Sequence, residues 1–345
     1  MPGGRIARTR DRNRPRLARS KWFARPFAAG GQIREGVADV KVSVIMRTKN
    51  SDWVVAQALE GLFAQSFRDF ELFVVDSGST DRTLEIVGRY PAHVRRIAAR
   101  DYYPGQVLNE AIRAVSGDVL VFQNSDVIPQ VPDALARLLA PLADPAVVAT
   151  FARQVPRPEA LGWVRRDLAT AFPAAGPAPA WMTYALPFAA MRRSAWEAHP
   201  FFTDAWGSED SEWGAWATRT GHAIRYVPEA LVMHSHNYTL REILGRRFIE
   251  GEADAFIHRD RDSVWRMLRR VTRSTLSDAL ALVRARDLSG LAAAPVRRAA
   301  YHLGYYRGHK HGERRLAEND TDTRTGQRMV LEWFGGAGTS ERRPR

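Results

Sequence analysis

Four groups of polar residues in this sequence combine residue types that can perform acid–base chemistry or bind a metal ion. They are Asp76 with Asp81, Asn124-Ser-Asp126, Glu209-Asp210 and His234-Ser-His236. An ionised carboxylate can act as a general base, and carboxylate oxygens and imidazole nitrogens are ligands of divalent cations. The chain contains no cysteine, so a metal site in it would use Asp, Glu or His side chains.

Two of these groups directly follow predicted β-strands. The apolar run 70–75 leads into Asp76, and the run 119–123 leads into Asn124-Ser-Asp126. Ligands of open α/β sheets bind at the carboxyl ends of the strands, so we expect Asp76 and Asp126 at one sheet edge. A divalent cation bound by Asp126 could meet a diphosphate there. Either aspartate, taken alone, could also be a turn or cap residue.

Glu209 and Asp210 stand at the start of a predicted helix. Negative charge is favoured in the first turn of a helix, so capping alone would explain the pair. An ionised Asp210 could equally take the proton from an attacking hydroxyl group. Trp206 lies in the preceding loop and could stack on a sugar ring, whereas Trp213 and Trp216 have the spacing of buried helix positions.

His234 ends a short predicted strand, and strand alternation directs His236 to the same side. A single histidine at such a position is often structural. One carboxylate oxygen, one imidazole and phosphate oxygens would together suit Mn²⁺ or Mg²⁺. His234 therefore joins Asp126 as a candidate ligand of a metal and diphosphate site.

Strands and helices alternate through the first part of the chain. We expect strands at 42–46, 71–75, 94–98 and 119–122 and helices at 53–64, 83–88, 106–115 and 132–142. This order is typical of an α/β fold with a doubly wound, parallel sheet. The Pro-rich segment 155–187 is predicted to be an irregular loop or lid, followed by helices at 194–198 and 210–220 and short strands at 223–227 and 231–234.

Beyond Thr239 the pattern is helical, with helices predicted at 240–256, 263–283 and 292–308. In the second of these, one face carries Val264, Leu268, Val271, Leu276, Ala279 and Val283, and the other carries Arg266, Arg269, Arg270 and Arg273. Such a helix could pack on the catalytic domain with a solvated basic face, or lie on a membrane surface. We divide the chain into a disordered basic arm (1–36), a catalytic domain (37–240), a helical C-terminal region (241–335) and a disordered tail (336–345).

The net charge of +13 is concentrated near the ends of the chain. Residues 1–25 hold nine Lys or Arg against one Asp, which gives +8, and residues 341–345 give +2, which leaves +3 for the rest. This distribution argues against a nucleic-acid partner, and the basic arm could be a solvated tail without a partner or could contact anionic membrane lipids. No apolar run reaches roughly 18 residues, and the basic N-terminus lacks the apolar stretch of a secretory signal. We expect a cytoplasmic protein, peripheral at the inner face of the membrane.

Taken in order, these motifs resemble those of the family 2 inverting glycosyltransferases of the GT-A fold, especially bacterial rhamnosyltransferase-like members. The resemblance covers residues 42–250. It rests on Val42–Asn50, Phe70–Asp81, Gly105 with Asn109, Ser116–Phe122, Glu209-Asp210 and His234–Leu240. The family's usual Asp-x-Asp is Asn124-Ser-Asp126 here, so its first carboxylate is missing, which bears on metal affinity.

The resemblance implies a GT-A nucleotide-diphospho-sugar transferase fold and a role for each candidate residue. Asp210 would be the catalytic base, with Glu209 beside it, and Asp126 and His234 would hold a divalent cation, Mn²⁺ or Mg²⁺. The implied donor-binding residues are Arg47, Thr48, Asn50, Asp76, Asn109 and Asn124, and the implied acceptor-binding residues are Trp206 and His236.

The predicted function is inverting transfer of a sugar, with rhamnose as a candidate, from a nucleotide-sugar donor to a glycan or lipid-linked acceptor in cell-envelope polysaccharide synthesis. Two alternatives remain. A nucleotidyltransferase would also use a Rossmann-like nucleotide site, although Arg47-Thr-Lys-Asn50 lacks the glycines of a phosphate loop. A nucleic-acid-binding protein would use the basic arm and bind with a steep salt dependence.

Overall fold

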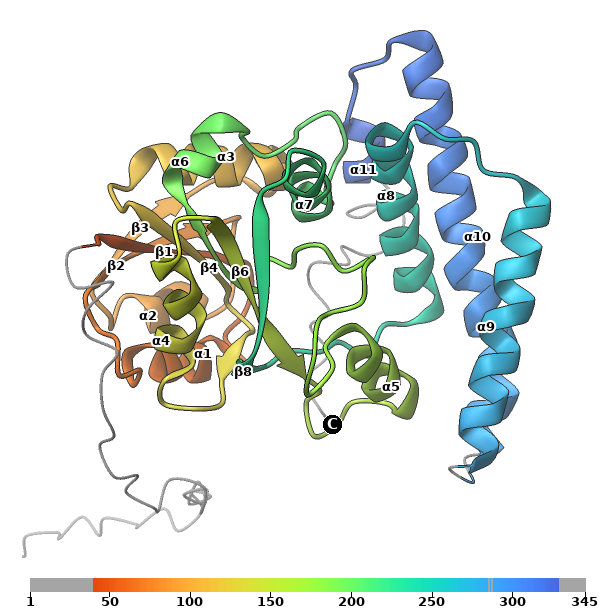
Figure 1. The fold of residues 1–345 in the computed structure, drawn as a ribbon, viewed down its shortest axis with the longest axis horizontal. Helices are drawn as coiled ribbons and strands as arrows, with labels where there is room; N and C mark the ends of the chain where they lie inside the picture. Colours follow the sequence, from red (N-terminus) through yellow and green to blue (C-terminus); the bar gives the residue numbers. More distant parts are fainter. Residues whose placement is uncertain (1–39, 285, 287, 329–345) are drawn as a thin grey trace, which may run out of the picture. The chain divides into compact units, whose positions relative to one another are not determined.

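An eight-stranded mixed sheet forms the centre of the fold, with strand order β3-β2-β1-β4-β7-β6-β8-β5 (Figure 1). The computed structural model describes residues 40–284, 286 and 288–328, so the predicted arm (1–36) and tail (336–345) lie outside the described residues. The strands are β1 (Val42–Thr48), β2 (Phe70–Asp76), β3 (Ala92–Arg96), β4 (Val119–Asn124), β5 (Ile128–Pro129), β6 (Val147–Val155), β7 (Phe188–Arg192) and β8 (Ala223–Met233).

The order of the first four strands creates a topological switch point between β1 and β4. The chain builds β1, β2 and β3 outward in one direction and then returns to place β4 on the other side of β1, all in parallel. In this register Arg47 lies beside Asn124, and Thr48 lies beside Asp76. Ligands bind outside the carboxyl ends of the strands at such a point, which confirms the expected sheet edge.

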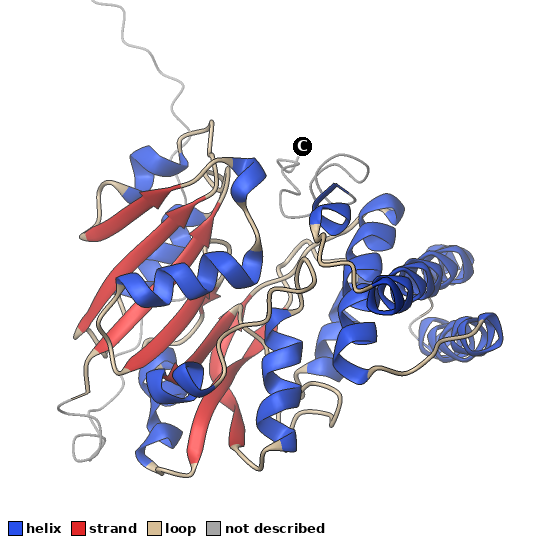
Figure 2. Cartoon of the chain, turned by 90° about the horizontal axis from the view of Figure 1, so that it is seen from above, coloured by secondary structure: helices blue, strands red, loops and turns tan. Residues whose placement is uncertain are grey.

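Helices cover both faces of the sheet, as the doubly wound prediction requires (Figure 2). The helices of this part are α1 (Val55–Phe63), α2 (Thr83–Val87), α3 (Pro104–Ala114), α4 (Ala134–Leu139), α5 (Gly162–Ala171), α6 (Arg193–Ala198) and α7 (Glu209–Arg219). Helices α1, α2 and α4 pack on one face, and α3, α6 and α7 pack on the other. Strand alternation divides β1 between these layers, with Val44 in the first core and Ile45 in the second.

The middle of the chain differs from the sequence prediction. Strands β6 and β7 were not expected, and β7 runs antiparallel to both β4 and β6. The β7 segment Phe-Ala-Ala-Met-Arg lacks the β-branched residues that mark strands in a sequence. The prediction of an irregular segment over 155–187 is partly wrong because α5 lies within it, and the two short strands expected at 223–227 and 231–234 form the single strand β8.

The C-terminal part contains α8 (Leu240–His258), α9 (Val264–Arg284), α10 (Leu288–Glu318) and α11 (Arg324–Arg328), and α8, α10 and α9 lie side by side (Figure 1). A capping box between Thr239 and Glu242 begins α8. Of the two alternatives for α9, packing of its apolar face on the catalytic domain is wrong, since Val264, Leu268 and Leu276 are exposed.

A row of glycines lets α10 approach α8 closely. A Cβ atom at Gly304 would lie 2.6 Å from the carbonyl oxygen of Leu244, and one at Gly312 would lie 2.6 Å from that of Glu252. Between them, a Cβ atom at Gly308 would overlap the carbonyl oxygen of Phe248. The obstacle is backbone in each case, so a side chain at these positions could be accommodated only by moving a helix.

We expect Gly308→Ala to lower the free energy of unfolding by about 1–3 kcal/mol, the usual cost of overpacking, despite the better helix propensity of alanine. Urea denaturation measures this change. The matched control is Gly88→Ala, where the added Cβ would lie 3.3 Å from its nearest neighbour, the carbonyl oxygen of Leu84. Equal stability of the two variants would contradict the close packing of α8 and α10.

Within residues 40–284, 286 and 288–328, no helix combines the length and apolar character needed to cross a bilayer.

Candidate active site

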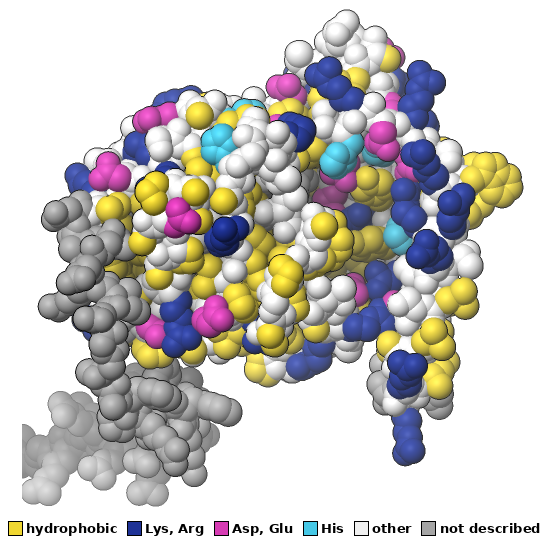
Figure 3. All heavy atoms as spheres, viewed as in Figure 1, with side chains coloured by type: hydrophobic (Ala, Val, Ile, Leu, Met, Phe, Trp, Pro, Cys, Tyr) yellow, Lys and Arg dark blue, Asp and Glu magenta, His cyan; other side chains and the backbone are white. Residues whose placement is uncertain are grey.

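A cavity of about 1000 Å³ opens at the switch point of the sheet. Its walls come from the loops after β1 and β4, the segment 180–187, the start of α7, the two histidines after β8, and helices α8, α9 and α10. The space-filling view shows a hollow with charged side chains between the sheet-bearing part and these helices (Figure 3). The predicted helical region therefore contributes a wall of the site, which the sequence analysis did not anticipate.

Arg47 connects the sheet edge to the start of α7. From the end of β1 its guanidinium donates to Glu209 Oε1 at 2.7 Å and to Asn124 Oδ1 at 3.3 Å. The Arg47–Glu209 ion pair is largely buried, with side-chain exposures of 16% and 7%. Glu209 is therefore held in place by a fixed partner, and its neighbour Asp210 also lines the cavity.

The backbone before α7 is held in a conformation that aims this acidic pair. Gly207 has φ +128° and Ser208 has φ +58°, two consecutive residues in the region of positive φ. A Cβ atom at Gly207 would lie 2.9 Å from Ile249, so α8 presses on the turn and leaves room only for glycine. Strained backbone of this kind persists where the surrounding structure fixes it, and it is concentrated at functional sites.

Asp210 has the properties of a carboxylate prepared to accept a proton. Its Oδ1 accepts from the amide of Ser211 at 2.8 Å, and its Oδ2 accepts from the amide of Leu186 at 3.3 Å. Burial, followed by the negative charge of Glu209, raises the pKa of Asp210 to about 6. A carboxylate with a pKa close to neutral is a better base than an ordinary aspartate and is still ionised at pH 7.

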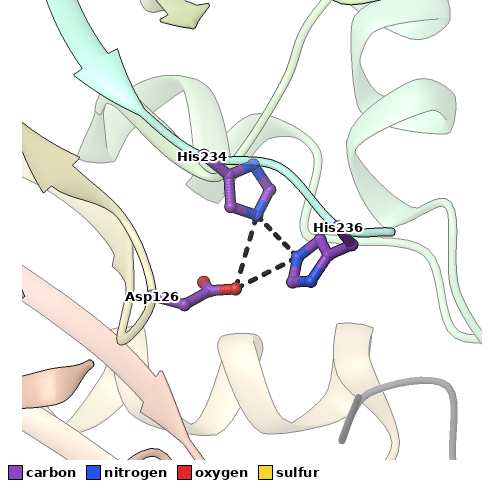
Figure 4. Close-up of side chains that lie close together, drawn as sticks. All are labelled: Asp126, His234 and His236. Atoms are coloured by element: carbon purple, nitrogen blue, oxygen red, sulfur yellow. Dashed lines mark hydrogen bonds and ion pairs between the residues drawn. The ribbon is translucent and has the colours of Figure 1, made fainter. Parts of the chain in front are cut away.

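Asp126 and the two histidines after β8 converge on one point (Figure 4). Asp126 Oδ2 lies 3.1 Å from His236 Nε2 and 3.6 Å from His234 Nε2, and the two Nε2 atoms are 3.1 Å apart. One carboxylate oxygen and two imidazole nitrogens form a donor set that suits a divalent cation. The family resemblance implies an acceptor role for His236, whereas the structure groups it with the candidate metal ligands.

The surroundings of this group favour ligation. The Nδ1 atom of His234 lies 2.7 Å from Gln154 Oε1, so it carries the proton and leaves Nε2 with its lone pair free for a metal ion. Burial lowers the pKa of His236, which keeps its imidazole neutral, and Tyr238 stacks on that ring. Gln154 and Tyr238 were not predicted, because neither residue type is itself a metal ligand in the patterns considered.

The predicted donor-binding residues separate into two sets. Arg47, Thr48, Asn50 and Asn124 line the cavity, as do the proposed ligand Asp126 and the acidic pair. The Oγ1 atom of Thr48 is buried and has no hydrogen-bond partner in the described part of the chain. A buried hydroxyl without a partner costs free energy, so an incoming ligand atom would satisfy it.

The structure does not bring Asp76 and Asn109 to the cavity wall. Asp76 is fully buried, and its carboxylate accepts from the amides of Gly78 and Ser79, which holds the turn after β2. Both polar atoms of the Asn109 side chain are engaged, since Nδ2 donates to the carbonyl of Phe201 and Oδ1 accepts from its amide. Their observed contacts are structural, and a contact of either with a nucleotide stays a prediction.

The aromatic residues of the cavity also differ from expectation. Trp206, the predicted sugar platform, lines the cavity but is only 8% exposed, and its Nε1 donates to the carbonyl of Tyr102. Trp181, on the opposite segment 180–187, is 64% exposed. Trp181 offers the larger open ring surface, and an isolated Trp in a Pro- and Ala-rich loop was the signal that could have identified it.

Comparison with known proteins matches this chain to one family and to several relatives. Residues 43–206 match the family described as Glycosyl transferase family 2. The chain is 28% identical over 227 residues to the O-antigen chain rhamnosyltransferase RfbN of Salmonella typhimurium, a match that covers 61% of this chain and 72% of the relative. It is 30% identical over 205 residues to the O-antigen chain rhamnosyltransferase WbaN of Salmonella anatum, covering 54% of this chain and 63%, less than two thirds, of that relative.

Solved structures share the fold. The mannosyltransferase PcManGT from Pyrobaculum calidifontis, in complex with GDP-Man and Mn²⁺, has a TM-score of 0.53 at 19% identity, covering 92% of this chain and 88% of its own. Glucosyl-3-phosphoglycerate synthase from Mycobacterium tuberculosis, in complex with UDP, has a TM-score of 0.50 at 22% identity, covering 69% and 88%. These likenesses confirm the predicted GT-A fold.

Proposed function

Because residues 43–206 belong to glycosyl transferase family 2 and the chain is a glycosyltransferase, we propose that it transfers a sugar with inversion from a nucleotide-diphosphate donor. The acceptor is a glycan or a lipid-linked glycan of cell-envelope polysaccharide synthesis. Rhamnose is the proposed sugar, since two relatives with matches over more than half of this chain are O-antigen rhamnosyltransferases. The predicted cytoplasmic location, peripheral at the inner face of an anionic membrane, is part of this proposal.

The donor would bind across the ends of β1 and β4. Thr48, whose hydroxyl has no hydrogen-bond partner among the described residues, lines the cavity from the end of β1, Asn50 lines it from the loop that follows, and Asn124 lines it from the end of β4. Arg47 cannot serve as a free phosphate ligand without releasing Glu209, so its proposed role is to fix Asn124 and Glu209 in position. This placement supports a nucleotide at the switch point of the sheet.

A divalent cation fits the group formed by Asp126, His234 and His236. The three donor atoms lie within 4.8 Å of one another, and Gln154 fixes the tautomer of His234. His236 would supply a ligand in place of the carboxylate that the Asn124-Ser-Asp126 motif lacks. When bound there, the cation would neutralise the charge of the departing diphosphate.

Asp210 would supply the base. The acceptor hydroxyl oxygen attacks the anomeric carbon as the bond from that carbon to the donor phosphate oxygen breaks, and the electron pair leaves with the nucleoside diphosphate. The hydroxyl proton passes to Asp210. Attack on the face opposite the leaving group inverts the anomeric configuration. Glu209, held by Arg47, keeps the pKa of Asp210 raised through its negative charge.

The acceptor would lie between α7 and the C-terminal helices. Side chains of α8 and α10 line this side of the cavity, including Glu250 and Asp254 on α8 and Tyr301 and Tyr305 on α10. Hydroxyl-rich acceptors suit such a mixture of carboxylates and aromatic rings. We add Trp181 to the predicted acceptor residue Trp206 as a platform for a sugar ring, because its ring is the more exposed.

The observation that carries this proposal is the shared cavity of Asp210, with its raised pKa, and the Asp126–histidine group. A thermal-shift screen of nucleotide sugars, with and without Mn²⁺, tests it. Nucleotide sugars that carry one particular base are expected to raise the Tm of the protein by a few degrees near saturation. The shift in Tm should be larger when Mn²⁺ is present. The corresponding free nucleosides are the controls. Absence of binding and hydrolysis for every nucleotide sugar would contradict the proposal.

A further inference from the structure

Helix α9 has two faces of opposite character. Its inner face packs on α10, where Asp278 and Leu282 are buried, and sends Arg270 to the cavity wall. Its outer face exposes a row of large apolar side chains at helical spacing. This outer stripe consists of Val264, Trp265, Leu268, Leu276, Leu280 and Val283, each more than 40% exposed. Trp265, at 74%, is the most exposed large hydrophobic residue in the described part of the chain.

Arginines flank the outer stripe, and no acidic residue lies beside it on α9. Arg266, Arg269, Arg273 and Arg284 are exposed along the helix. Within the described residues, Arg269, Arg273 and Arg284 form no ion pair. The single acidic residue of α9, Asp278, is buried and neutralised by Arg166, Arg297 and Arg298. Figure 3 shows exposed hydrophobic and basic side chains together over the C-terminal helices.

We propose that the outer stripe of α9 lies in the surface of an anionic lipid bilayer, with Trp265 among the acyl chains and the flanking arginines at the headgroups. A helix with one apolar face bordered by arginine is suited to this interface, and tryptophan favours it. The charge pattern selects this partner over a second copy of the chain, because pairing two outer stripes would bring two rows of arginines together.

This docking would explain why the acceptor side of the cavity is built from the same helices, an argument that rests on the proposed function. Arg270 on the inner face of α9 and Tyr305 on α10 both line the cavity, and the Arg270 guanidinium lies 5.0 Å from the Tyr305 ring centroid. A helix with its side chains is about 10–12 Å thick. A bilayer on the outer face would therefore lie about one helix diameter from the acceptor wall, within reach of a lipid-linked substrate.

Sedimentation of the full chain with vesicles of phosphatidylcholine and phosphatidylglycerol tests the stripe. The variant carries Trp265→Ser, Leu276→Ser and Leu280→Ser, and we expect it to bind at least tenfold more weakly. Val94→Ser, at an exposed apolar position on β3, is the matched control and should bind like the wild type. The basic N-terminal segment is present in every protein compared, so its contribution cancels. Arg269→Gln with Arg273→Gln should weaken binding about fivefold for each charge removed.

A second measurement reports insertion directly. Brominated acyl chains should quench part of the tryptophan fluorescence of the wild type, and Trp265→Phe should remove that part. Equal quenching in both proteins, or a triple variant that binds vesicles as well as the wild type, would overturn the inference. A triple variant that loses self-association in light scattering but keeps vesicle binding would assign the stripe to a second copy instead. Nucleotide-sugar binding, measured in parallel, is expected to be unchanged, which separates this inference from the proposed function.

Discussion

Asp210→Asn is expected to lower kcat for sugar transfer by on the order of 10³-fold while leaving the Kd of the nucleotide sugar within about twofold of the wild type. Asparagine has one side-chain oxygen, which can keep the 2.8 Å hydrogen bond from the amide of Ser211 and gives up the longer, 3.3 Å bond from the amide of Leu186, so the start of α7 should be preserved. The neutral carboxamide cannot take the proton from the attacking hydroxyl group. Isothermal titration with the donor and a steady-state transfer assay together measure the two quantities.

The raised pKa of the Asp210 carboxyl group also predicts how the reaction depends on pH. With its pKa raised to about 6 by burial and by the charge of Glu209, kcat should rise with pH and level off above about pH 6. Asp210→Asn should remove this limb of the profile along with the activity. A residual activity with an unchanged limb near pH 6 would mean that another group is the base.

The free energy of unfolding, in contrast to kcat, should fall as pH rises through 6. The native state holds the Asp210 proton more tightly than the unfolded chain, so this group's contribution is complete below about pH 4 and is lost as pH rises through 6. The shift from 3.8 to about 6 corresponds to roughly 3 kcal/mol above pH 6. Asp210→Asn avoids that cost, and we expect a higher Tm at pH 7 than for the wild type.

Asp204→Asn is the matched control for these measurements, because Asp204 is an exposed carboxylate of the same loop. It should leave transfer, donor binding and Tm unchanged. Equal loss of donor binding and transfer in Asp210→Asn would show that Asp210 holds the site together and is not the base.

Removing a ligand of the Asp126–histidine group is expected to have the second large effect. Asp126→Asn should weaken Mn²⁺ binding by roughly 100-fold or more and lower kcat/KM by on the order of 10³-fold, because charge on the departing diphosphate would no longer be neutralised. Electron paramagnetic resonance of the free Mn²⁺ signal measures binding without donor or acceptor, so it reads the site independently of activity.

His236→Ala decides between the two roles considered for that residue. As a metal ligand, the role that its 3.1 Å separation from Asp126 supports, its loss should weaken Mn²⁺ binding at least tenfold. As an acceptor residue, the role implied by the sequence, its loss would raise the acceptor KM and leave Mn²⁺ binding unchanged. His258→Ala is the control, since His258 lines the same cavity but lies outside the group.

Much of the site could be predicted because its residues occupy positions defined by local pattern. Asp126 follows a strand directly, so its place at the sheet edge depends only on recognising β4. Asp210 lies at the start of α7, where a carboxylate and a helix start can be identified from adjacent residues. The parallel order of β1 to β4 follows from their alternation with helices, because parallel strands need a crossover connection.

Other assignments depended on contacts between residues far apart in the chain. The ion pair between Arg47 and Glu209 spans 162 positions and engages one acid of the pair, which leaves Asp210 as the proposed base. Burial of the Asp210 carboxyl and the approach of His236 to Asp126 likewise arise only when the sheet edge, α7 and the end of β8 meet. No local pattern encodes these distances, so the sequence could name the residues but could not divide the roles among them.

The sequence by itself therefore determined the α/β fold, the sheet edge that holds the site and the carboxylates and histidines available there, since these depend on periodicity and residue type. The tertiary structure decided that Asp76 and Asn109 are held by structural contacts, that His236 lies with the candidate metal ligands and that the apolar face of α9 points outward. The physical reason is that burial, pairing and exposure are properties of neighbours brought together by folding, and α9 shows this directly. Four residues of its outer stripe, Val264, Leu268, Leu276 and Val283, were recognised in the sequence, but only the packing of its other face on α10 showed which side was left uncovered.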